Sequence, residues 1–277
     1  MRLCTFYHRD QHDQTQAGIW RAEGVLPLGL PDIKAVIERY AKEELVALDD
    51  QGGDLIPLDE IVYAAPYTTP PKIWGIGLNY QEHAADLDEV SPHEEPASFM
   101  KPTTAIIGPG QTIVLPQQSD RVTGEAELGV IIGQRCKDVA LAEVPEVIFG
   151  YTTIIDMTAE DILRRNPRFL TRSKSFDTFF SFGPLVLTPD EVPEVNALLV
   201  KTIRNGQVTA ENVVSNMMFP PFELVSFHSK VMTLEPGDII STGTPGAVHI
   251  QHGDVVKCHI EGVGSLENPV VDSKVRG

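Results

Sequence analysis

The sequence has no apolar stretch close to the roughly 20 residues that a membrane-spanning helix needs. Its first ten residues also lack the apolar core of an export signal. Cysteine is scarce: Cys4, Cys136 and Cys258 are odd in number, far apart and without CxxC spacing, which argues against a disulfide scaffold and a thiolate zinc site. We therefore expect buried free thiols in a cytoplasmic protein without a membrane span.

Basic residues are few as well. The chain has 22 Lys and Arg against 39 Asp and Glu, which gives a formal net charge of -17. Because a protein that binds nucleic acid needs a surplus of Lys and Arg on one face, we expect no nucleic-acid partner. Carboxylates can bind a cation instead, although an acidic surface commonly serves only to keep a protein soluble.

The length of 277 residues permits one large domain, or a small domain with a larger one. Prolines cluster at residues 66–71, and consecutive prolines favour extended backbone. We therefore predict a small N-terminal domain at 1–69 and a main domain at 70–277. One helix is expected in the first domain, from Pro31 to Glu44. The polar, proline-punctuated segment 89–97 is typical of a loop.

Short apolar runs rich in β-branched residues recur through the main domain, and Gly or Pro separates most of them. This pattern is typical of strands. We expect strands at residues 72–77, 105–107, 112–115, 127–132, 151–155, 184–187, 198–203, 238–241 and 254–260. Helices are expected at 79–88, after residue 158 and at 222–230. The expected fold class is α+β and rich in β-structure.

Three acidic residues beside apolar runs are candidates for a metal site. Glu125 and Glu127 open a strand-like run two positions apart, so their side chains point to the same face. Asp156 follows a second apolar run, at the expected junction of a strand and a helix. Hard oxygen ligands favour Mg2+ or Mn2+, with Ca2+ as a further option. The alternative is that both glutamates lie on a solvated strand face and that Asp156 only caps a helix.

Five motifs occur along the chain in one order. They are Asn79-Tyr-Gln-Glu-His83, Gly124-Glu-Ala-Glu-Leu-Gly-Val-Ile-Ile-Gly133, Gly150-Tyr-Thr-Thr-Ile-Ile-Asp-Met-Thr-Ala159, Lys174-Ser-Phe-Asp with Gly183-Pro184, and Thr242-Gly-Thr-Pro-Gly246. This ordered set resembles the fumarylacetoacetate hydrolase family. The resemblance covers residues 73 to about 270, whereas the first 70 residues match only loosely.

The resemblance implies a β-rich fold with a rolled mixed sheet, a homodimer, and a Mg2+ or Mn2+ ion held by Glu125, Glu127 and Asp156. Members of the family hydrolyse C–C bonds in β-diketo acids, decarboxylate acids similar to oxaloacetate, or move protons between keto and enol forms. One physical idea unites these reactions, because a chelated cation stabilises negative charge on an enolate oxygen.

The resemblance also implies roles for single residues. Lys174 matches the active-site lysine, although an exposed surface lysine is the alternative. His83 matches the histidine that deprotonates water or substrate, with a helix-surface histidine as the alternative. Asp86, three residues later, is placed to orient that imidazole. Tyr80 and Thr244 match substrate-binding positions, and for Thr244 a simple turn threonine is the competing interpretation.

Two residues depart from the family pattern. Glu160 stands where many relatives have an arginine, and Leu163 where they have a glutamine. A guanidinium is the natural partner of a substrate carboxylate, whereas a glutamate repels one. Activity on small oxo acids is therefore in question, unless Arg164 or Arg165 supplies the charge.

Three functional hypotheses follow. The first is a metal-dependent hydrolase that cleaves a C–C bond in a 1,3-dicarbonyl compound such as a β-diketo acid or acylpyruvate. The second uses the same site without water, as an oxaloacetate-type decarboxylase or a keto–enol tautomerase. The third is a non-catalytic relative that acts as a binding protein, which the substitutions at Glu160 and Leu163 favour and the intact acidic set opposes.

Overall fold

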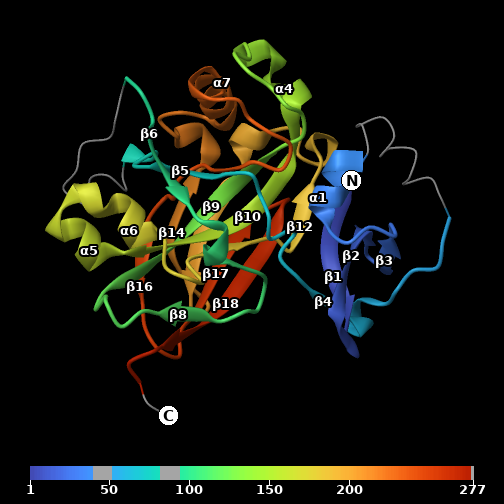
Figure 1. Ribbon diagram of the computed structural model, residues 1–277, viewed down its shortest axis with the longest axis horizontal. Helices are drawn as coiled ribbons and strands as arrows, with labels where there is room; N and C mark the ends of the chain where they lie inside the picture. Colours follow the sequence, from blue (N-terminus) through green and yellow to red (C-terminus); the bar gives the residue numbers. More distant parts are fainter. Residues whose placement is uncertain (40–51, 82–93, 276–277) are drawn as a thin grey trace.

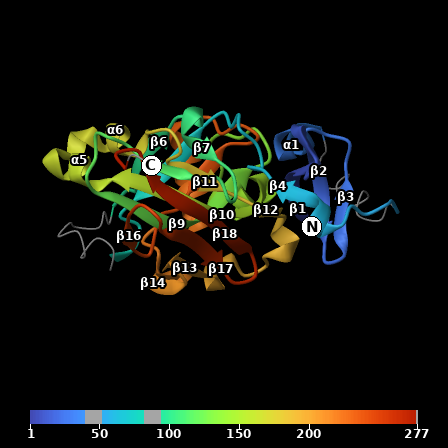
Figure 2. The ribbon, with the colours of Figure 1, turned by 90° about the horizontal axis from the view of Figure 1, so that it is seen from below.

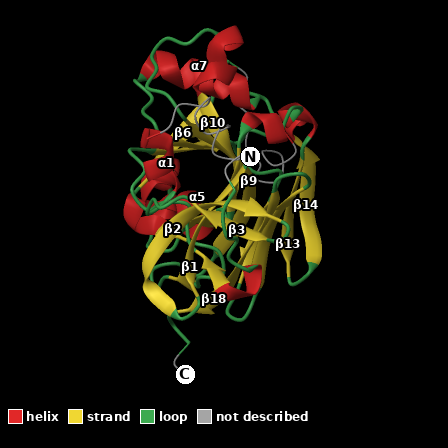
Figure 3. Ribbon diagram, turned by 90° about the vertical axis from the view of Figure 1, so that its right-hand side faces the viewer, coloured by secondary structure: helices red, strands yellow, loops and turns green. Residues whose placement is uncertain are grey.

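The computed structural model describes residues 1–39, 52–81 and 94–275. Two packed sheets form the core of the structure, with the helices at the periphery (Figures 1 and 3). The α+β, β-rich fold class expected from the sequence is confirmed.

The large sheet is mixed. Its main path runs in the order β3 (Gly24–Pro27), β2 (Gln11–Arg21), β1 (Arg2–His8), β12 (Leu185–Leu187), β10 (Ile148–Ala159), β9 (Val122–Ile132), β15 (Ile239–Ser241), β5 (Ile73–Gly77) and β6 (Ala97–Lys101). Further strands pair at its sides: β4 (Ile61–Tyr63) on β1, β16 (Ala247–Ile250) on β9, β11 (Phe180–Phe182) on β10, and β7 (Ile106–Ile107) on β11.

The smaller sheet lies beside the large one (Figure 2). Its strands run in the order β14 (Gln207–Val213), β13 (Leu199–Arg204), β17 (Val255–Ile260), β18 (Gly264–Asp272) and β8 (Ile113–Leu115). Each strand predicted from an apolar run is present in the structure, within a few residues of its expected bounds.

The helices are short. They are α1 (Ile33–Arg39), α4 (Val144–Val147), α5 (Glu160–Arg165), α6 (Leu170–Lys174) and α7 (Pro221–Val231), with 3-10 turns at Leu58–Glu60, Thr103–Ala105, Leu141–Glu143, Pro167–Phe169, Pro189–Glu191, Val195–Ala197 and Val214–Asn216. The helix predicted at 222–230 is confirmed by α7. The predicted helices at 31–44 and 79–88 each extend beyond the described residues.

The strands β9 and β10 form the centre of the core. Every residue of both strands is buried, because the large sheet is covered on both faces at this point and the side chains are mainly apolar on both sides. The two strands pair along almost their whole length in antiparallel register. They therefore provide a long and rigid ladder on which polar side chains can be held at fixed positions.

The N-terminal strands continue the large sheet, because β1 pairs antiparallel with β12. Figure 1 shows them at the side of the molecule away from α5 and α6. The division into domains at residues 69 and 70 stays a prediction. The three cysteines are free thiols, as expected, but only Cys4 and Cys258 are buried, whereas Cys136 is half-buried.

Candidate metal centre and active site

Three carboxylates converge in the β9–β10 ladder, near the end where β9 begins. Glu125 and Glu127 lie on β9, and Asp156 lies on β10 directly opposite Glu125. One oxygen of each lies within 4.8 Å of the others. Their residues are only 6%, 1% and 0% exposed, respectively. We call these three residues the acid cluster.

The alternative interpretation of these acids is wrong. Glu125 and Glu127 do not face solvent, and Asp156 does not cap a helix, because Ala159 occupies the cap position of α5. Asp156 also lies inside β10 rather than at the predicted junction of strand and helix. The strand continues past it because Met157, Thr158 and Ala159 still pair with β9.

Hydrogen bonds hold Glu125 and Glu127 in place. Oε1 of Glu125 accepts from the hydroxyls of Thr123 at 3.0 Å and Thr158 at 2.6 Å. Oε2 of Glu127 accepts from the hydroxyl of Ser241 and from the backbone N–H of Gly243 at 2.9 Å. Fixed carboxylates need little reorganisation to bind an ion, which favours a preformed site.

Gly243 reaches Glu127 only because it has no side chain. Its φ is +97°, which L residues rarely adopt, and an added Cβ would stand 2.8 Å from the Cβ of Asn79. The side chain of Asn79 in turn donates to the backbone oxygen of Thr242 at 2.8 Å. The motifs around Asn79 and Gly243 therefore build one wall beside the acid cluster.

Lys174 lies at the end of α6 and joins two of the acids. Its Nζ donates to Glu125 Oε2 at 2.8 Å and to Asp156 Oδ2 at 2.6 Å. The residue is buried, so the alternative of an exposed surface lysine is wrong. Burial alone would lower the pKa of Lys174, but the Asp156 and Glu125 carboxylates outweigh burial and raise the pKa above its usual value.

A second buried lysine was not predicted from the sequence. Lys101 ends β6, and its Nζ donates to Asp156 Oδ1 and to the backbone oxygen of Met157. Burial lowers the pKa of Lys101 to about 8, although the Asp156 carboxylate opposes the shift. The sequence carries one weak signal, because Lys101 shares a strand face with the buried Phe99.

The charges of the acid cluster are not fully balanced by these lysines. Three carboxylates face two ammonium groups within the described residues, so one negative charge is left over when all three carboxylates are ionised. Burial, and next the Asp156 carboxylate, raises the pKa of Glu127 above its usual range. A hard divalent cation fits this arrangement, because the donors are oxygens and the excess charge is negative.

The predicted substrate-binding residues lie close to this centre. The hydroxyl of Tyr80 is buried and has no hydrogen-bond partner among the described residues. Burial, and next the Glu127 carboxylate, raises the pKa of Tyr80. Thr244 is also buried, and its hydroxyl is 3.1 Å from the backbone oxygen of Gly246, as expected of a turn threonine. The substrate contacts of both residues stay predictions. His83 and Asp86 lie outside the described residues.

Glu160 is paired with two arginines, and its expected repulsion of a substrate carboxylate stays a prediction. Its side chain is 8% exposed and accepts hydrogen bonds from Arg121 and Arg164. Arg165 pairs instead with Asp161 at 3.0 Å. Arg121 comes from the segment before β9 and was missed by the sequence analysis. We call Arg121, Glu160 and Arg164 the arginine corner.

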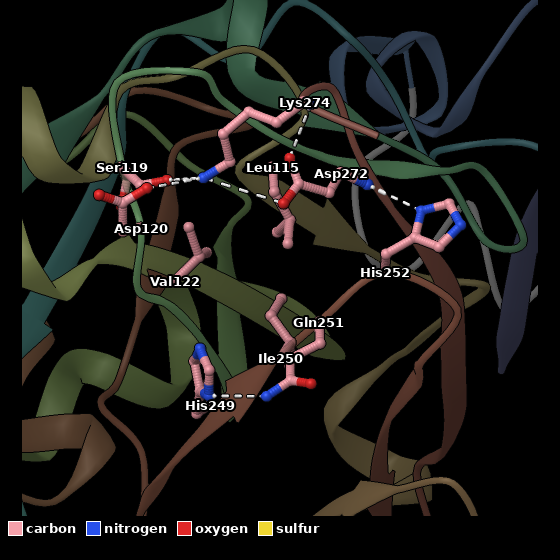
Figure 4. Close-up of a pocket in the computed structure, with 10 residues that line it drawn as sticks. All are labelled: Leu115, Ser119, Asp120, Val122, His249, Ile250, Gln251, His252, Asp272 and Lys274. Carbon is pink, nitrogen blue, oxygen red and sulfur yellow. Dashed lines mark hydrogen bonds and ion pairs between the residues drawn. The ribbon is translucent and has the colours of Figure 1, made fainter. Parts of the chain in front are cut away.

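A separate pocket of about 350 Å³ opens beyond the start of β9 (Figure 4). It is lined by Leu115, Ser119, Asp120, Val122, His249, Ile250, Gln251, His252, Asp272 and Lys274. No residue of the acid cluster lines it. Lys274 is paired with Asp120 at 3.1 Å and lies 3.8 Å from Asp272, so its charge is already compensated. This pocket is therefore separate from the acid cluster.

Comparison with known proteins identifies the family. The sequence model of the fumarylacetoacetate (FAA) hydrolase C-terminal region matches residues 72–271. The chain belongs to the fumarylacetoacetate hydrolase family. This match confirms the resemblance that the five motifs indicated, over nearly the same residues.

Relatives with a named activity are similar to most of the chain. A mitochondrial oxaloacetate tautomerase of Rattus norvegicus is 34% identical over 78% of this chain and 72% of its own length. A 5-carboxymethyl-2-hydroxymuconate delta-isomerase from Mycobacterium smegmatis is 34% identical with a TM-score of 0.80, covering 99% of this chain and 100% of its own. A maleylpyruvate hydrolase from Sphingobium is 29% identical with a TM-score of 0.81, at the same coverages.

The protein is therefore an enzyme of this family and acts on small molecules, and the non-catalytic hypothesis loses its support. Enzymes of the family generally use divalent metals. Among the described residues, no helix is long and apolar enough to cross a membrane. The homodimer, the cytoplasmic location and the absence of a nucleic-acid partner stay predictions.

Proposed function

We propose that the protein is a divalent-metal-dependent hydrolase that cleaves a C–C bond in a 1,3-dicarbonyl substrate, such as a β-diketo acid or acylpyruvate. The convergence of Glu125, Glu127 and Asp156 within 4.8 Å in a buried site is the observation that carries this proposal. Buried like charges this close are costly unless a cation compensates them. An arrangement of this kind is typical of functional sites.

The acid cluster would hold Mg2+ or Mn2+, with Ca2+ as a further option. When bound, the ion supplies electrophilic stabilisation of the negative charge that develops on a substrate oxygen. The chain's own residues supply the remaining functions of the site.

Lys174 would contribute a second positive charge at a substrate oxygen. An ammonium group has three N–H donors, and the hydrogen bonds to Glu125 and Asp156 account for two of them. The third is suited to a substrate oxygen beside the acid cluster. The unpartnered hydroxyl of Tyr80 and the hydroxyl of Thr244 are the further candidates for substrate hydrogen bonds.

We assign the base to His83, oriented by Asp86, on the motif in which both occur. The imidazole would take one proton from water, and the water oxygen would bond to a substrate carbonyl carbon. The C–C bond next to that carbon then breaks, and its electron pair leaves on the neighbouring carbon as an enolate. This enolate takes a proton, so the products are a carboxylate and a ketone.

A substrate panel tests this proposal. Purified protein with Mg2+ would be incubated with acylpyruvates, other β-diketo acids and oxaloacetate, and new carboxylate, CO2 and keto–enol exchange would each be measured. We expect new carboxylate from a 1,3-dicarbonyl acid, and strong loss of this activity in Glu127→Gln. Asp161→Asn, an acidic residue outside the acid cluster, is the matched control. Turnover that persists in Glu127→Gln would contradict the proposal.

Tautomerisation is the second candidate, because the rat tautomerase and the mycobacterial isomerase are both 34% identical to this chain. It needs the same cation, Lys174 and a base, but no attacking water. Keto–enol exchange of oxaloacetate without new carboxylate or CO2 would favour it, whereas release of CO2 would favour an oxaloacetate-type decarboxylase.

A further inference from the structure

The arginine corner joins two elements around one buried carboxylate. Arg164 on α5 donates to Oε1 of Glu160 through Nε at 3.0 Å and through Nη2 at 2.6 Å. Arg121, from the segment before β9, donates to Oε2 through Nε. The side chain of Glu160 is 8% exposed, whereas those of Arg121 and Arg164 are 48% and 61% exposed. The carboxylate of Glu160 is therefore shielded from solvent, whereas the guanidinium groups of Arg121 and Arg164 are accessible to solvent.

A row of polar side chains connects the acid cluster to this corner. Glu125 pairs with Asp156, and Thr123, two residues earlier on β9, pairs with Thr158, two residues later on β10. Alternate residues of a strand share a face, and both threonines donate to Glu125. The next position in the row is the arginine corner, where the backbone N–H of Glu160 donates to the oxygen of Arg121 at 2.9 Å.

The corner lies at a distance that one elongated substrate can span. Four residues of extended chain separate it from the pair Glu125 and Asp156, which is about 13 Å between backbone positions at 3.3 Å per residue. Long arginine side chains shorten this gap. The helix α5, which carries Glu160, also packs against α6, which carries Lys174 (Figures 1 and 2).

The corner is locally positive in a chain of net charge -17. Two guanidinium groups face one carboxylate, which leaves one positive charge. Burial, and next Arg121 and Arg204, lowers the pKa of the neighbouring His249. Arg121 contacts Glu160 through Nε, which leaves the Nη1 and Nη2 edge of its guanidinium to bind a carboxylate in bidentate fashion.

We propose that the arginine corner, chiefly Arg121, binds a second carboxylate of the substrate. The substrate would then be an oxo acid with a carboxylate at the end remote from the reacting carbonyl group. This inference rests on the proposed function, because it takes the acid cluster as the place where the oxo-acid end of the substrate binds. Glu160 acts here as a positioning residue for Arg121.

A neighbouring ion pair on the same helix provides a matched control. Arg165 pairs with Asp161 four residues earlier, as Arg164 pairs with Glu160. However, Arg165 and Asp161 lie outside the row that leads to the acid cluster. If positive charge near α5 strengthened the binding of carboxylates in general, replacing Arg165 would weaken that binding as replacing an arginine of the arginine corner does. If the arginine corner is a specific carboxylate site, only replacement of its own arginines would weaken the binding.

The test compares two ligands of equal chain length, 2-oxoadipate and 2-oxohexanoate, which differ only in the terminal carboxylate. Their dissociation constants would be measured by calorimetry on the Mg2+-loaded protein. We expect at least about tenfold tighter binding of 2-oxoadipate by the wild type. Arg121→Gln should lose this preference and bind 2-oxohexanoate unchanged, and Arg165→Gln should keep the preference.

Equal binding of the two acids by the wild type, or no binding of either, would overturn the proposal. So would an undiminished preference in Arg121→Gln. These outcomes do not depend on turnover, so they are distinct from a failure of the proposed reaction, which the substrate panel detects. Melting temperatures of the variants would verify that each is folded.

The positioning role of Glu160 has its own test. If Glu160 acts through Arg121, Glu160→Gln should change the preference for 2-oxoadipate in the wild-type background and leave it unchanged in the Arg121→Gln background. The same change in both backgrounds would show that Glu160 does not act through Arg121.

Discussion

The acid cluster lies on β9 and β10, and the arginine corner lies just beyond the adjoining ends of these two strands, yet their charges are placed differently. In the acid cluster both the carboxylates and the lysines that contact them are buried. In the arginine corner only the carboxylate is buried, and the cations reach solvent. This difference suits the two regions to different roles. In the acid cluster, buried charges of both signs hold the side chains in fixed positions. In the arginine corner, cations that reach solvent around a buried carboxylate can bind a ligand.

The largest expected difference between the two regions concerns stability. Asp156→Asn leaves Lys101 and Lys174 buried beside a neutral group, and removal of one partner from a buried ion pair costs about 3 to 5 kcal/mol. We expect the free energy of unfolding in urea, without added metal, to fall by this amount. A loss below about 1 kcal/mol would mean that the lysines do not depend on Asp156.

Within the described part of the chain, the buried residue His228 has no charged partner, unlike the buried lysines of the acid cluster, so it shows what burial without an ion pair does to a titratable group. His228 on α7 is 1% exposed and packs edge-on against Trp74 and Phe227. Neither of its ring nitrogens has a hydrogen-bond partner among the described residues. Burial lowers its pKa from 6.5 to about 4. His228 is therefore neutral in the folded protein at a pH where it is protonated in the unfolded chain.

The sign of the pH effect follows from this lowered pKa. As pH falls below 6.5, the unfolded chain takes up a proton that folded His228 does not bind until about pH 4. The free energy of unfolding therefore decreases over this window, by about 2 kcal/mol between about pH 7.5 and about pH 5. Urea titrations at the two pH values would measure this decrease. In His228→Phe we expect the free energy of unfolding to fall by less between them, because the contribution of His228 is absent. An identical pH dependence in the variant would contradict the assignment.

The smallest expected effect is at the arginine corner. Glu160→Gln removes the carboxylate from two pairs whose cations are 48% and 61% exposed, so water replaces most of what is lost. We expect the free energy of unfolding to fall by about 1 kcal/mol, as for pairs near the surface. A loss as large as that of Asp156→Asn would remove the contrast between the two regions.

The sequence predicted the parts of the site that local patterns encode. The spacing of Glu125 and Glu127 on a strand placed both on one face, and the motifs indicated Asp156 and Lys174. Lys101 and Arg121 were missed because their partners lie 55 and 39 residues away along the chain. Lys101 ends β6, which is four places from β10 in the sheet order, so only the three-dimensional fold of the sheet brings it to Asp156. Arg121 reaches Glu160 because it precedes β9 where β9 pairs with the end of β10. The pairing of Glu160 with Arg121 could not be predicted from the sequence for the same reason.

The central claim is that the acid cluster holds one hard cation. Calorimetric titration of metal-free protein with Mn2+ tests this claim most directly, because it does not depend on the identity of the substrate. We expect one ion per chain in the wild type and in Asp161→Asn. In Glu127→Gln we expect an affinity at least about a hundredfold lower, since the loss of an outer-shell partner alone costs up to that much. No binding in the wild type, or equal binding in Glu127→Gln, would contradict the account.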